Sequence, residues 1–233
     1  MKRTIFLVAG LALAIVAHAA EDRLIEHSQD SKGLEGLGID ANVGSIDLVG
    51  WDKAGIEIEV KLEDEDRGWG WRNRSEKAIA AAELKIVERG NRLFLEIDYG
   101  DEDDDDVEEH WTVRAPQGFS IEAELNVGEM EIDNFSGGVD ADLNVGELVV
   151  SVPRGDVHAE GNVGEVSVES ETDSLGDVSV ETNVGDAVLL IRGDRIRATG
   201  PRFSPGGEAS YSGDGDDDIV AEVNVGEASV IVR

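Results

Sequence analysis

The side chains in this sequence that could do chemistry are mainly carboxylates, together with a few histidines and one cluster of arginine and tryptophan. There are 52 Asp and Glu residues against 20 Lys and Arg residues, no cysteine, and a formal net charge of −32. The lack of cysteine excludes thiol nucleophiles, disulfides and a lipid-bearing cysteine. Paired carboxylates could serve a glycoside hydrolase, but among so many acids such pairs are inevitable and indicate nothing specific.

Three histidines, His27, His110 and His158, lie beyond the N-terminal leader of the chain. None of them has the HxxxH or HExxH spacing of a zinc site. His158 stands between Val157 and Ala159, which we expect to face the core, so its own side chain should point to solvent. No glycine-rich phosphate loop follows a strand and opens a helix. We therefore expect surface histidines and no enzymatic activity.

One acidic segment, "SGDGDDDIV", deserves comparison with a calcium-binding loop. Asp214, Asp216 and Asp218 match positions 1, 3 and 5 of an EF-hand. Position 6 should be glycine and is Ile219, and position 12 should be glutamate and is Val225. The segment is therefore no EF-hand, although a weak Ca²⁺ site of looser form stays open as an alternative. No other cofactor is indicated.

The segment "RGWGWRNR" is unusual in so acidic a chain, because it combines aromatic rings with positive charge. Flat aromatic rings beside guanidinium groups suit sugar rings or acidic glycans. Alternatively, the tryptophans cover one end of the fold, and the arginines pair with the acidic "EDED" that precedes them. The candidate ligand patch consists of Arg67, Trp69, Trp71, Arg72 and Arg74.

A repeated motif predicts the elements that must position these groups. Asn-Val-Gly followed by Ser, Asp or Glu occurs six times, at intervals of 84, 18, 18, 21 and 41 residues. "PGGEASY" from Pro205 aligns with "NVGEASV" from Asn224 and would divide the last interval into 22 and 19 residues. A period near 20 residues is typical of stacked β coils. The motif positions are Asn42, Gly44, Asn126, Gly128, Asn144, Gly146, Asn162, Gly164, Asn183, Gly185, Asn224 and Gly226.

Apolar residues alternate on both sides of each motif, which is the period of a β-strand. The parity slips by one residue across the motif: Leu125 and Val127 are two apart, but Val127 and Met130 are three apart. A straight strand would then turn its later side chains outward, so we expect a bend at Gly128, which tolerates positive φ. We predict a parallel β-solenoid of 18–22-residue coils, with an asparagine ladder and inward-facing corner valines.

The same stacking would place the acids after the motif in one column. Two unit charges ~4.8 Å apart repel by about 0.9 kcal/mol in water. We expect these side chains to splay into solvent, and cation binding is the alternative. The predicted column is Glu129, Glu147, Glu165, Asp186, Glu208 and Glu227.

The chain divides into a leader and one domain. Residues 1–20 have a basic start, an apolar run and "AHA", which is typical of a secretory signal peptide. We expect a flexible lead-in at 21–35 and a single all-β domain at 36–233, with residues 62–115 as a β-rich excursion that caps the stack. No later segment is apolar enough to predict a transmembrane span in the mature chain.

Within the excursion, we predict a helix with Ser75 as a possible cap and a hairpin of Leu84–Glu88 with Leu93–Tyr99. The run "DEDDDDVEE" that follows reads as a solvated acidic loop. We expect Trp51 and Trp111 to be core or cap residues.

The opening "GSIDLVGWDK", the excursion that closes at "VRAPQGFSIEAEL" and the repeated Gly-acid units resemble the bacterial putative-adhesin family, a domain of unknown function. The likeness covers residues 36–233. It implies right-handed coils and display in the envelope or at the surface, and it brings no catalytic positions.

These observations favour an exported, non-catalytic interaction module in the periplasm or at the cell surface. Its partner would be an envelope or surface component, either a glycan or a protein. Nucleic acid is excluded as a partner because phosphate binding needs a basic surface. The alternatives are an acidic Ca²⁺-binding structural protein and a small glycan-active enzyme.

Overall fold

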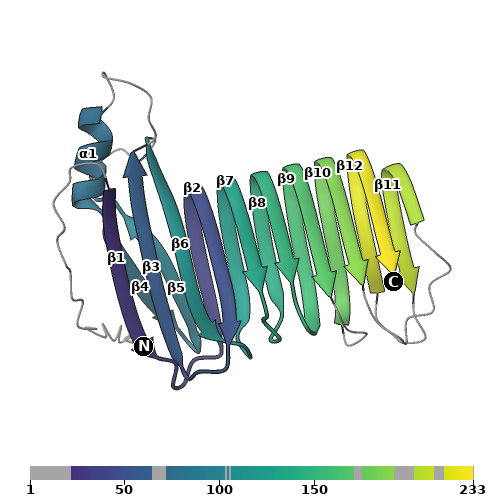
Figure 1. Cartoon of the computed structure of the whole chain (residues 1–233), viewed down its shortest axis with the longest axis horizontal. Coiled ribbons are helices and arrows are strands. Elements are labelled where there is room, and N and C mark those ends of the chain that lie inside the picture. The colour runs from purple at the N-terminus through teal and green to yellow at the C-terminus, as the bar shows by residue number, and fades with distance from the viewer. Residues whose placement is uncertain are drawn as a thin grey trace, which may run out of the picture.

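The computed structural model describes residues 22–64, 72–102, 104, 106–170, 175–191, 202–212 and 218–232. Over this part of the chain the protein is all-β, with one short helix, α1 (Arg72–Ala81), and a mostly parallel sheet. The sheet is not closed, because its path of paired strands begins at β1 (Asp22–Asp30) and ends at β11 (Arg202–Ser212) (Figure 1). No helix in these ranges has the length and apolar character needed to span a membrane. The predicted signal peptide lies outside the described residues.

Six long parallel strands form the main part of the sheet, in the order β2-β7-β8-β9-β10-β12. Each motif glycine pairs with the motif glycine of the next strand. The register advances by 18 residues from β7 to β8 and again to β9, by 21 to β10 and by 41 to β12. The strands are β2 (Gly36–Trp51), β7 (Ser120–Asp133), β8 (Val139–Ser151), β9 (Gly155–Ser170), β10 (Leu175–Ile191) and β12 (Asp218–Val232).

Each of these strands bends at its Asn-Val-Gly motif, which Figure 1 shows as a row of arches. Gly146 has a φ of 141°, where L side chains are strained, and a Cβ added there would lie 1.8 Å from the carbonyl oxygen of Gly128. The Thr182 hydroxyl donates to the carbonyl oxygen of Asp186 at 3.2 Å. Residues four apart in a straight strand are separated by about 13 Å. This contact therefore requires the bend.

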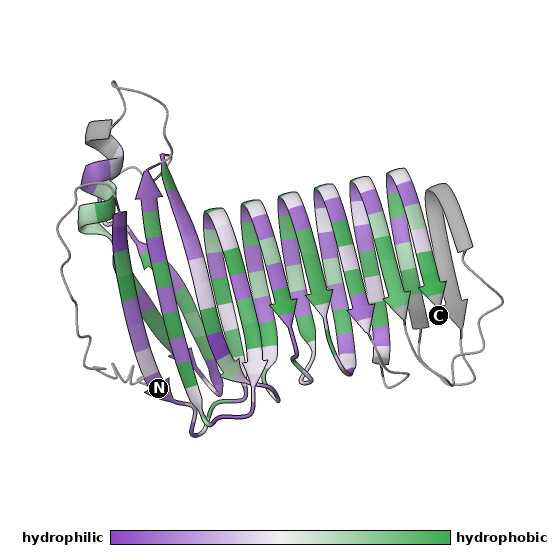
Figure 2. Ribbon diagram, in the orientation of Figure 1, coloured by the Kyte–Doolittle hydropathy of each residue, from purple (hydrophilic) through white to green (hydrophobic). Residues whose placement is uncertain are grey.

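The core is made by side chains that alternate along both halves of each bent strand, as the green and purple bands of Figure 2 show. The parallel register stacks equivalent residues, so each core position becomes a continuous column of apolar side chains. Burial of one such side chain contributes about 1.5–3 kcal/mol. One column after the bend is Leu48, Ile132, Val150, Val168, Leu189 and Val230, all buried.

The region predicted as an excursion supplies strands that pair with β2 on the side away from β7. β5 (Arg92–Asp98) pairs with the first half of β2, and β6 (Val107–Pro116) pairs with its second half, both in parallel. β4 (Glu83–Arg89) forms the predicted antiparallel hairpin with β5. Ser75 is fully buried inside α1, so it is not the cap of this helix.

β1 shows that the prediction of a flexible lead-in is wrong for Asp22–Asp30. This segment pairs antiparallel with β3 (Gly55–Asp64), which in turn pairs antiparallel with β6. Arg23 ties β1 to the end of α1, because its guanidinium donates to the carbonyl oxygens of Ile79 and Ala80 at 2.8 and 3.0 Å. An edge strand with one covered face needs few apolar residues, so its sequence shows little period.

β11 shows that the reading of "PGGEASY" as one further coil is wrong. β11 pairs antiparallel with β12, whereas β12 lies directly beside β10. Glu208 is consequently paired with Glu222 and does not join the column that ends at Glu227. The register is irregular between Pro205 and Gly207, where proline has no N–H to donate.

Candidate functional site

The outer side of the bends carries a continuous ladder of asparagine side chains. In each step the Nδ2 amide of one asparagine donates to the Oδ1 oxygen of the preceding one. The five steps join Asn126 to Asn42 (3.1 Å), Asn144 to Asn126 (2.8 Å), Asn162 to Asn144 (2.9 Å), Asn183 to Asn162 (3.0 Å) and Asn224 to Asn183 (2.9 Å). The ladder links six strands at the surface and fixes the orientation of each amide.

The middle valines of the motif also lie on the outside, so the prediction that they fill the inner corner is wrong. The side chains that point inward are those of Leu125 and Met130 and their equivalents, and the three residues Asn, Val and Glu between them are exposed. The relative exposures are 40% at Val127, 39% at Val145, 42% at Val163, 43% at Val184 and 63% at Val225. We name these five valines, with the asparagines of the ladder, the corner ridge.

Two columns of carboxylates flank the corner ridge. The after-corner column comprises Glu129, Glu147, Glu165, Asp186 and Glu227, which are paired in register and exposed. The before-corner column comprises Asp40, Glu124, Asp142, Glu160, Glu181 and Glu222, also in register. Strands β7, β8, β9, β10 and β12 contain no Lys or Arg.

Burial first, and repulsion from nearby acids second, raise the pKa of two carboxyl groups of the before-corner column. The pKa of Glu124 is raised, first by partial burial and then by Asp40 and Asp142 of its own column and other nearby acids. The pKa of Asp142 is raised by partial burial and by Asp140, and His158 opposes this rise. The before-corner column is therefore a surface on which negative charge is crowded.

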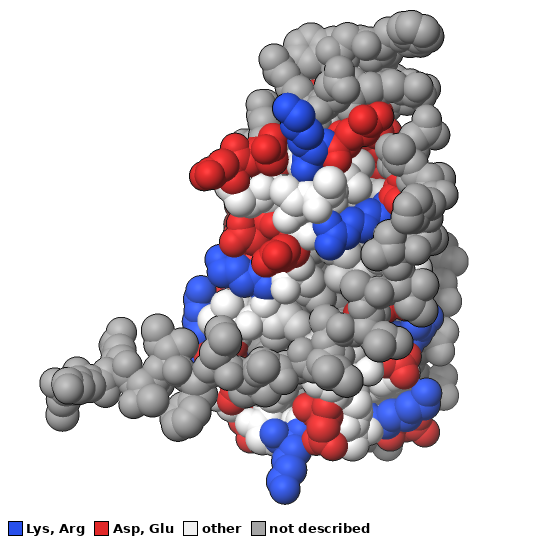
Figure 3. Space-filling view, turned by 90° about the vertical axis from the view of Figure 1, so that its left-hand side faces the viewer, with Lys and Arg blue, Asp and Glu red and all other residues white. Residues whose placement is uncertain are grey.

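The end of the sheet that carries β1 has a different charge distribution from the carboxylate columns. Figure 3, which faces the end that carries β1, shows Lys and Arg side chains interspersed with Asp and Glu. Lys61 pairs with Glu63 and lies 3.8 Å from Asp22, and Lys85 of β4 pairs with Glu96 of β5. Glu63 and Glu96 at this end thus have basic neighbours.

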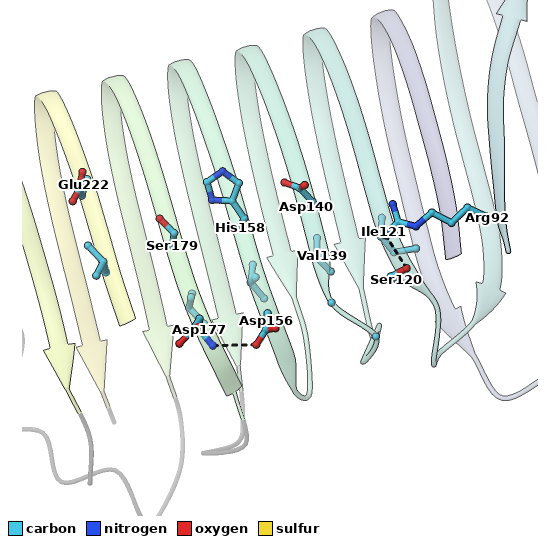
Figure 4. Close-up of a pocket in the computed structure, with 15 residues that line it drawn as sticks. Arg92, Ser120, Ile121, Val139, Asp140, Asp156, His158, Asp177, Ser179 and Glu222 are labelled. Carbon is cyan, nitrogen blue, oxygen red and sulfur yellow. Dashed lines mark hydrogen bonds between the residues drawn. The ribbon is translucent and has the colours of Figure 1, made fainter. Parts of the chain in front are cut away.

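A shallow groove crosses the strand halves that precede the bend. Figure 4 shows Asp140, His158, Ser179 and Glu222 on successive strands along it, with Arg92 at one end. Arg92 is held there by Glu122 and by the hydroxyl of Ser120, to which it donates at 3.0 Å. Asp156 and Asp177 also line the groove, so it is acidic over most of its length.

Sequence reasoning missed a buried carboxyl group. Glu109 on β6 is 4% exposed and accepts hydrogen bonds from the Tyr99 hydroxyl (2.8 Å) and from Nε1 of Trp111 (2.7 Å). Burial raises the pKa of Glu109 to about 7, against the opposing effect of these two donors, and Asp104 and Asp40 raise it further. The predicted acidic loop is wrong here, although the alternation with Val107 and Trp111 was a signal that Glu109 points inward.

The histidines differ in their surroundings. Nδ1 of His110 forms a hydrogen bond with the Ser45 hydroxyl at 2.9 Å. Nε2 of the same ring lies 3.2 Å from an oxygen of Glu63. His27 contacts Gln29 at 3.2 Å. His158 lies among carboxylates on the before-corner side, with its side chain 45% exposed. Of the described residues, the set Asp142, His158 and Glu160 could hold a metal ion.

The remaining predicted sites fall mostly outside the described residues. Trp111 is buried as expected, and Trp51 is half-buried, with its Nε1 donating to the carbonyl oxygen of Gly55 at 2.9 Å. Arg72 and Arg74 belong to the first turn of α1, and Asp218 begins β12. The positions outside the described ranges are Arg67, Trp69, Trp71, Asp214 and Asp216.

No protein-family model and no curated protein matches this chain. The crystal structures that are similar to it include the following two. One is a "putative cell adhesion protein" from Clostridium sporogenes, with a TM-score of 0.48 and 17% identity over 91% of this chain and 99% of that chain. The other is a "putative adhesin" from Bacteroides fragilis, with a TM-score of 0.30 and 14% identity over 90% of this chain and 96% of that chain. At such low TM-scores and identities, neither similarity settles the fold or the function of this chain.

Proposed function

We propose that this protein is an exported, non-catalytic interaction module of the cell envelope or cell surface, and that it binds a positively charged segment of another protein along the corner ridge. In this proposal, the repeating strands form a right-handed parallel β-solenoid that holds outward-facing groups at fixed intervals. The observation that supports this proposal most is the register of the two carboxylate columns on either side of the corner ridge.

Charge supplies the first argument for a basic partner. Neighbouring residues in a column are about one strand spacing, ~4.8 Å, apart, and two carboxylates at that separation repel by about 0.9 kcal/mol in water. Cationic side chains placed between the columns would relieve this repulsion. Like charges gathered on one surface also speed the encounter with a partner of opposite sign, and the acceleration weakens as salt rises.

The corner ridge supplies the second argument, because it offers both apolar contact and hydrogen bonds between the columns. The valines are 39–63% exposed, and the asparagine amides keep free lone pairs and N–H groups beside them. An extended peptide rises about 3.3 Å per residue, so about eight residues would cross the six strands. A segment that alternates apolar with Lys or Arg residues fits this surface.

Binding of a synthetic peptide with alternating Lys and Val residues, measured by calorimetry, tests the proposal. Replacing Glu147 and Glu165 with Gln should weaken binding by roughly threefold to tenfold, since exposed ion pairs contribute about 0.2–1 kcal/mol each. The matched control replaces Glu26 and Glu59 with Gln, which removes the same charge from a paired position on β1 and β3. Equal weakening in both variants would contradict the proposal, as would exclusive binding of an uncharged glycan.

A second candidate function, binding of Ca²⁺ by the carboxylate columns, is favoured by the raised pKa of Glu124 and Asp142, since crowded carboxylates gain from a cation. Calorimetry with CaCl₂ and thermal unfolding in its presence test this function. Absence of both binding heat and a rise in Tm would remove it and leave the peptide-binding proposal untouched.

A further inference from the structure

The geometry points to a binding site for a divalent transition-metal ion, of the class that Zn²⁺ represents, formed by Asp142, His158 and Glu160. The proposal is argued from one histidine and two carboxylates of the before-corner column. It does not depend on which partner binds the corner ridge.

The three side chains converge because of the parallel register. Asp142 on β8 is the direct register partner of Glu160 on β9, and His158 precedes Glu160 by two residues on the same strand. Residues two apart on a strand share a face, so all three point to the same side of the sheet. Their candidate ligand atoms lie within 4.8 Å of one another, and Nε2 of His158 lies 3.9 Å from Oε2 of Glu160.

These separations are close to those that a metal ion needs. With metal–ligand distances of about 2.0–2.2 Å in a tetrahedral site, neighbouring ligand atoms lie about 3.4 Å apart. The present gaps would have to close by about 1.4 Å at most, which rotation of three solvent-accessible side chains can supply. Three protein ligands leave a fourth position for water or for an external group.

The histidine makes the set selective for a transition metal. Imidazole nitrogen suits Zn²⁺, Cu²⁺ or Ni²⁺, whereas Ca²⁺ and Mg²⁺ prefer an all-oxygen set. On β7, β8 and β10 the positions equivalent to His158 and Glu160 are Glu122 with Glu124, Asp140 with Asp142, and Ser179 with Glu181. Those positions offer only oxygen ligands, so among these strands only β9 supplies a nitrogen ligand at this position.

The local charge favours a cation at this place. Asp140 is the register partner of His158, and Figure 4 shows these two side chains on neighbouring strands beside the groove. Strands β8 and β9 contain no Lys or Arg, so neither strand provides a lysine or arginine that would compete with a metal ion.

His110 provides a matched comparison within the same chain. Its Nε2 lies 3.2 Å from Glu63 and 3.6 Å from Glu108, which is again one histidine with two carboxylates. There, however, Lys61 pairs with Glu63, and the Ser45 hydroxyl contacts the other ring nitrogen of His110. A basic side chain is therefore already paired with one of the two carboxylates at His110.

Calorimetry with ZnCl₂ on the folded chain, with CaCl₂ as a second titrant, tests the site. We expect one Zn²⁺ per chain, and a His158→Gln variant that binds Zn²⁺ on the order of tenfold more weakly or worse. The His110→Gln variant should keep the wild-type Zn²⁺ affinity, and neither substitution should alter any Ca²⁺ binding. Absorption of bound Co²⁺ in the visible range should show nitrogen coordination that His158→Gln abolishes.

Circular dichroism of each variant establishes that it is folded before it is titrated. Unchanged Zn²⁺ affinity in His158→Gln would overturn the proposal and indicate cation condensation on the acidic surface. A loss in His110→Gln alone would equally overturn it. If the wild type failed to bind the Lys-Val peptide but still bound Zn²⁺ through His158, the proposed function would be refuted and this site would stand.

Discussion

Glu109 allows the sharpest test of the structural reasoning, because one substitution separates its effect from those of the other 51 acidic residues. The Glu109→Gln variant keeps the shape of the side chain and removes its charge. The Gln amide can accept the hydrogen bond from Nε1 of Trp111 and donate to the hydroxyl oxygen of Tyr99, which can act as an acceptor. Gln should therefore stand in for the protonated acid without leaving a buried group unpaired.

The expected magnitude follows from the pKa of Glu109, which rises from 4.5 to about 7 on folding. A group whose folded pKa is raised contributes stability that is fully present below its unfolded pKa, and this contribution is lost as pH rises through its folded pKa. Each pKa unit corresponds to about 1.36 kcal/mol, so the whole effect is about 3 kcal/mol. About 2.5 kcal/mol of it falls between pH 5 and pH 8.

The assay is urea unfolding of both proteins at several pH values in this range, followed by circular dichroism. Repulsion among the other carboxylates lowers the stability of both proteins as pH rises, and it cancels in the difference between them. We expect Glu109→Gln to gain about 2.5 kcal/mol relative to the wild type from pH 5 to pH 8. A Glu57→Gln control on the exposed face of β3 should show no such trend. A difference for Glu109→Gln that stays flat with pH would refute the buried, neutral carboxyl group.

The remaining predictions concern the bend. Gly146→Ala should prevent folding or lower the free energy of unfolding by roughly 3 kcal/mol or more in urea titrations, because its Cβ would lie 1.8 Å from the Gly128 carbonyl oxygen; a loss below about 1 kcal/mol would contradict the close approach. Val145→Ala should cost less than about 1 kcal/mol because the side chain is 39% exposed, whereas Leu148→Ala, fully buried, should cost about 2–5 kcal/mol. Similar losses in these two variants would refute the outward position of Val145. Asn144→Ala removes two exposed ladder bonds and should lower the free energy of unfolding by about 1–2 kcal/mol in urea titrations. No measurable loss would show that the ladder adds no stability.

The stacking of equivalent residues could be predicted because each pattern is local and recurs. Apolar alternation identifies which residues share a face, and equal intervals identify which residues become neighbours, such as Asn126 and Asn144. The β4–β5 hairpin is likewise local in sequence. These features depend on contacts within a strand or one repeat away, which the sequence displays directly.

The features that sequence reasoning missed depend on distant partners or on direction. Alternation shows that the strand bends between Leu125 and Met130, but it does not tell which side of the bend Val127 occupies. β1 and β11 are fixed by antiparallel pairing with strands further along the chain, and neither segment has a strong pattern of its own. His158 and Asp142 lie close together only because of the register between β8 and β9. No spacing motif along the sequence therefore indicates that they are close.

The repeated register has a consequence for how such a protein can vary. Because β7, β8 and β9 follow one another at intervals of 18 residues and expose the same groups, duplication or loss of one such unit would change the length of the surface and leave its chemistry unaltered. The number of contacts with a long partner, and with it the avidity, could then be tuned by tandem copying rather than by point substitution.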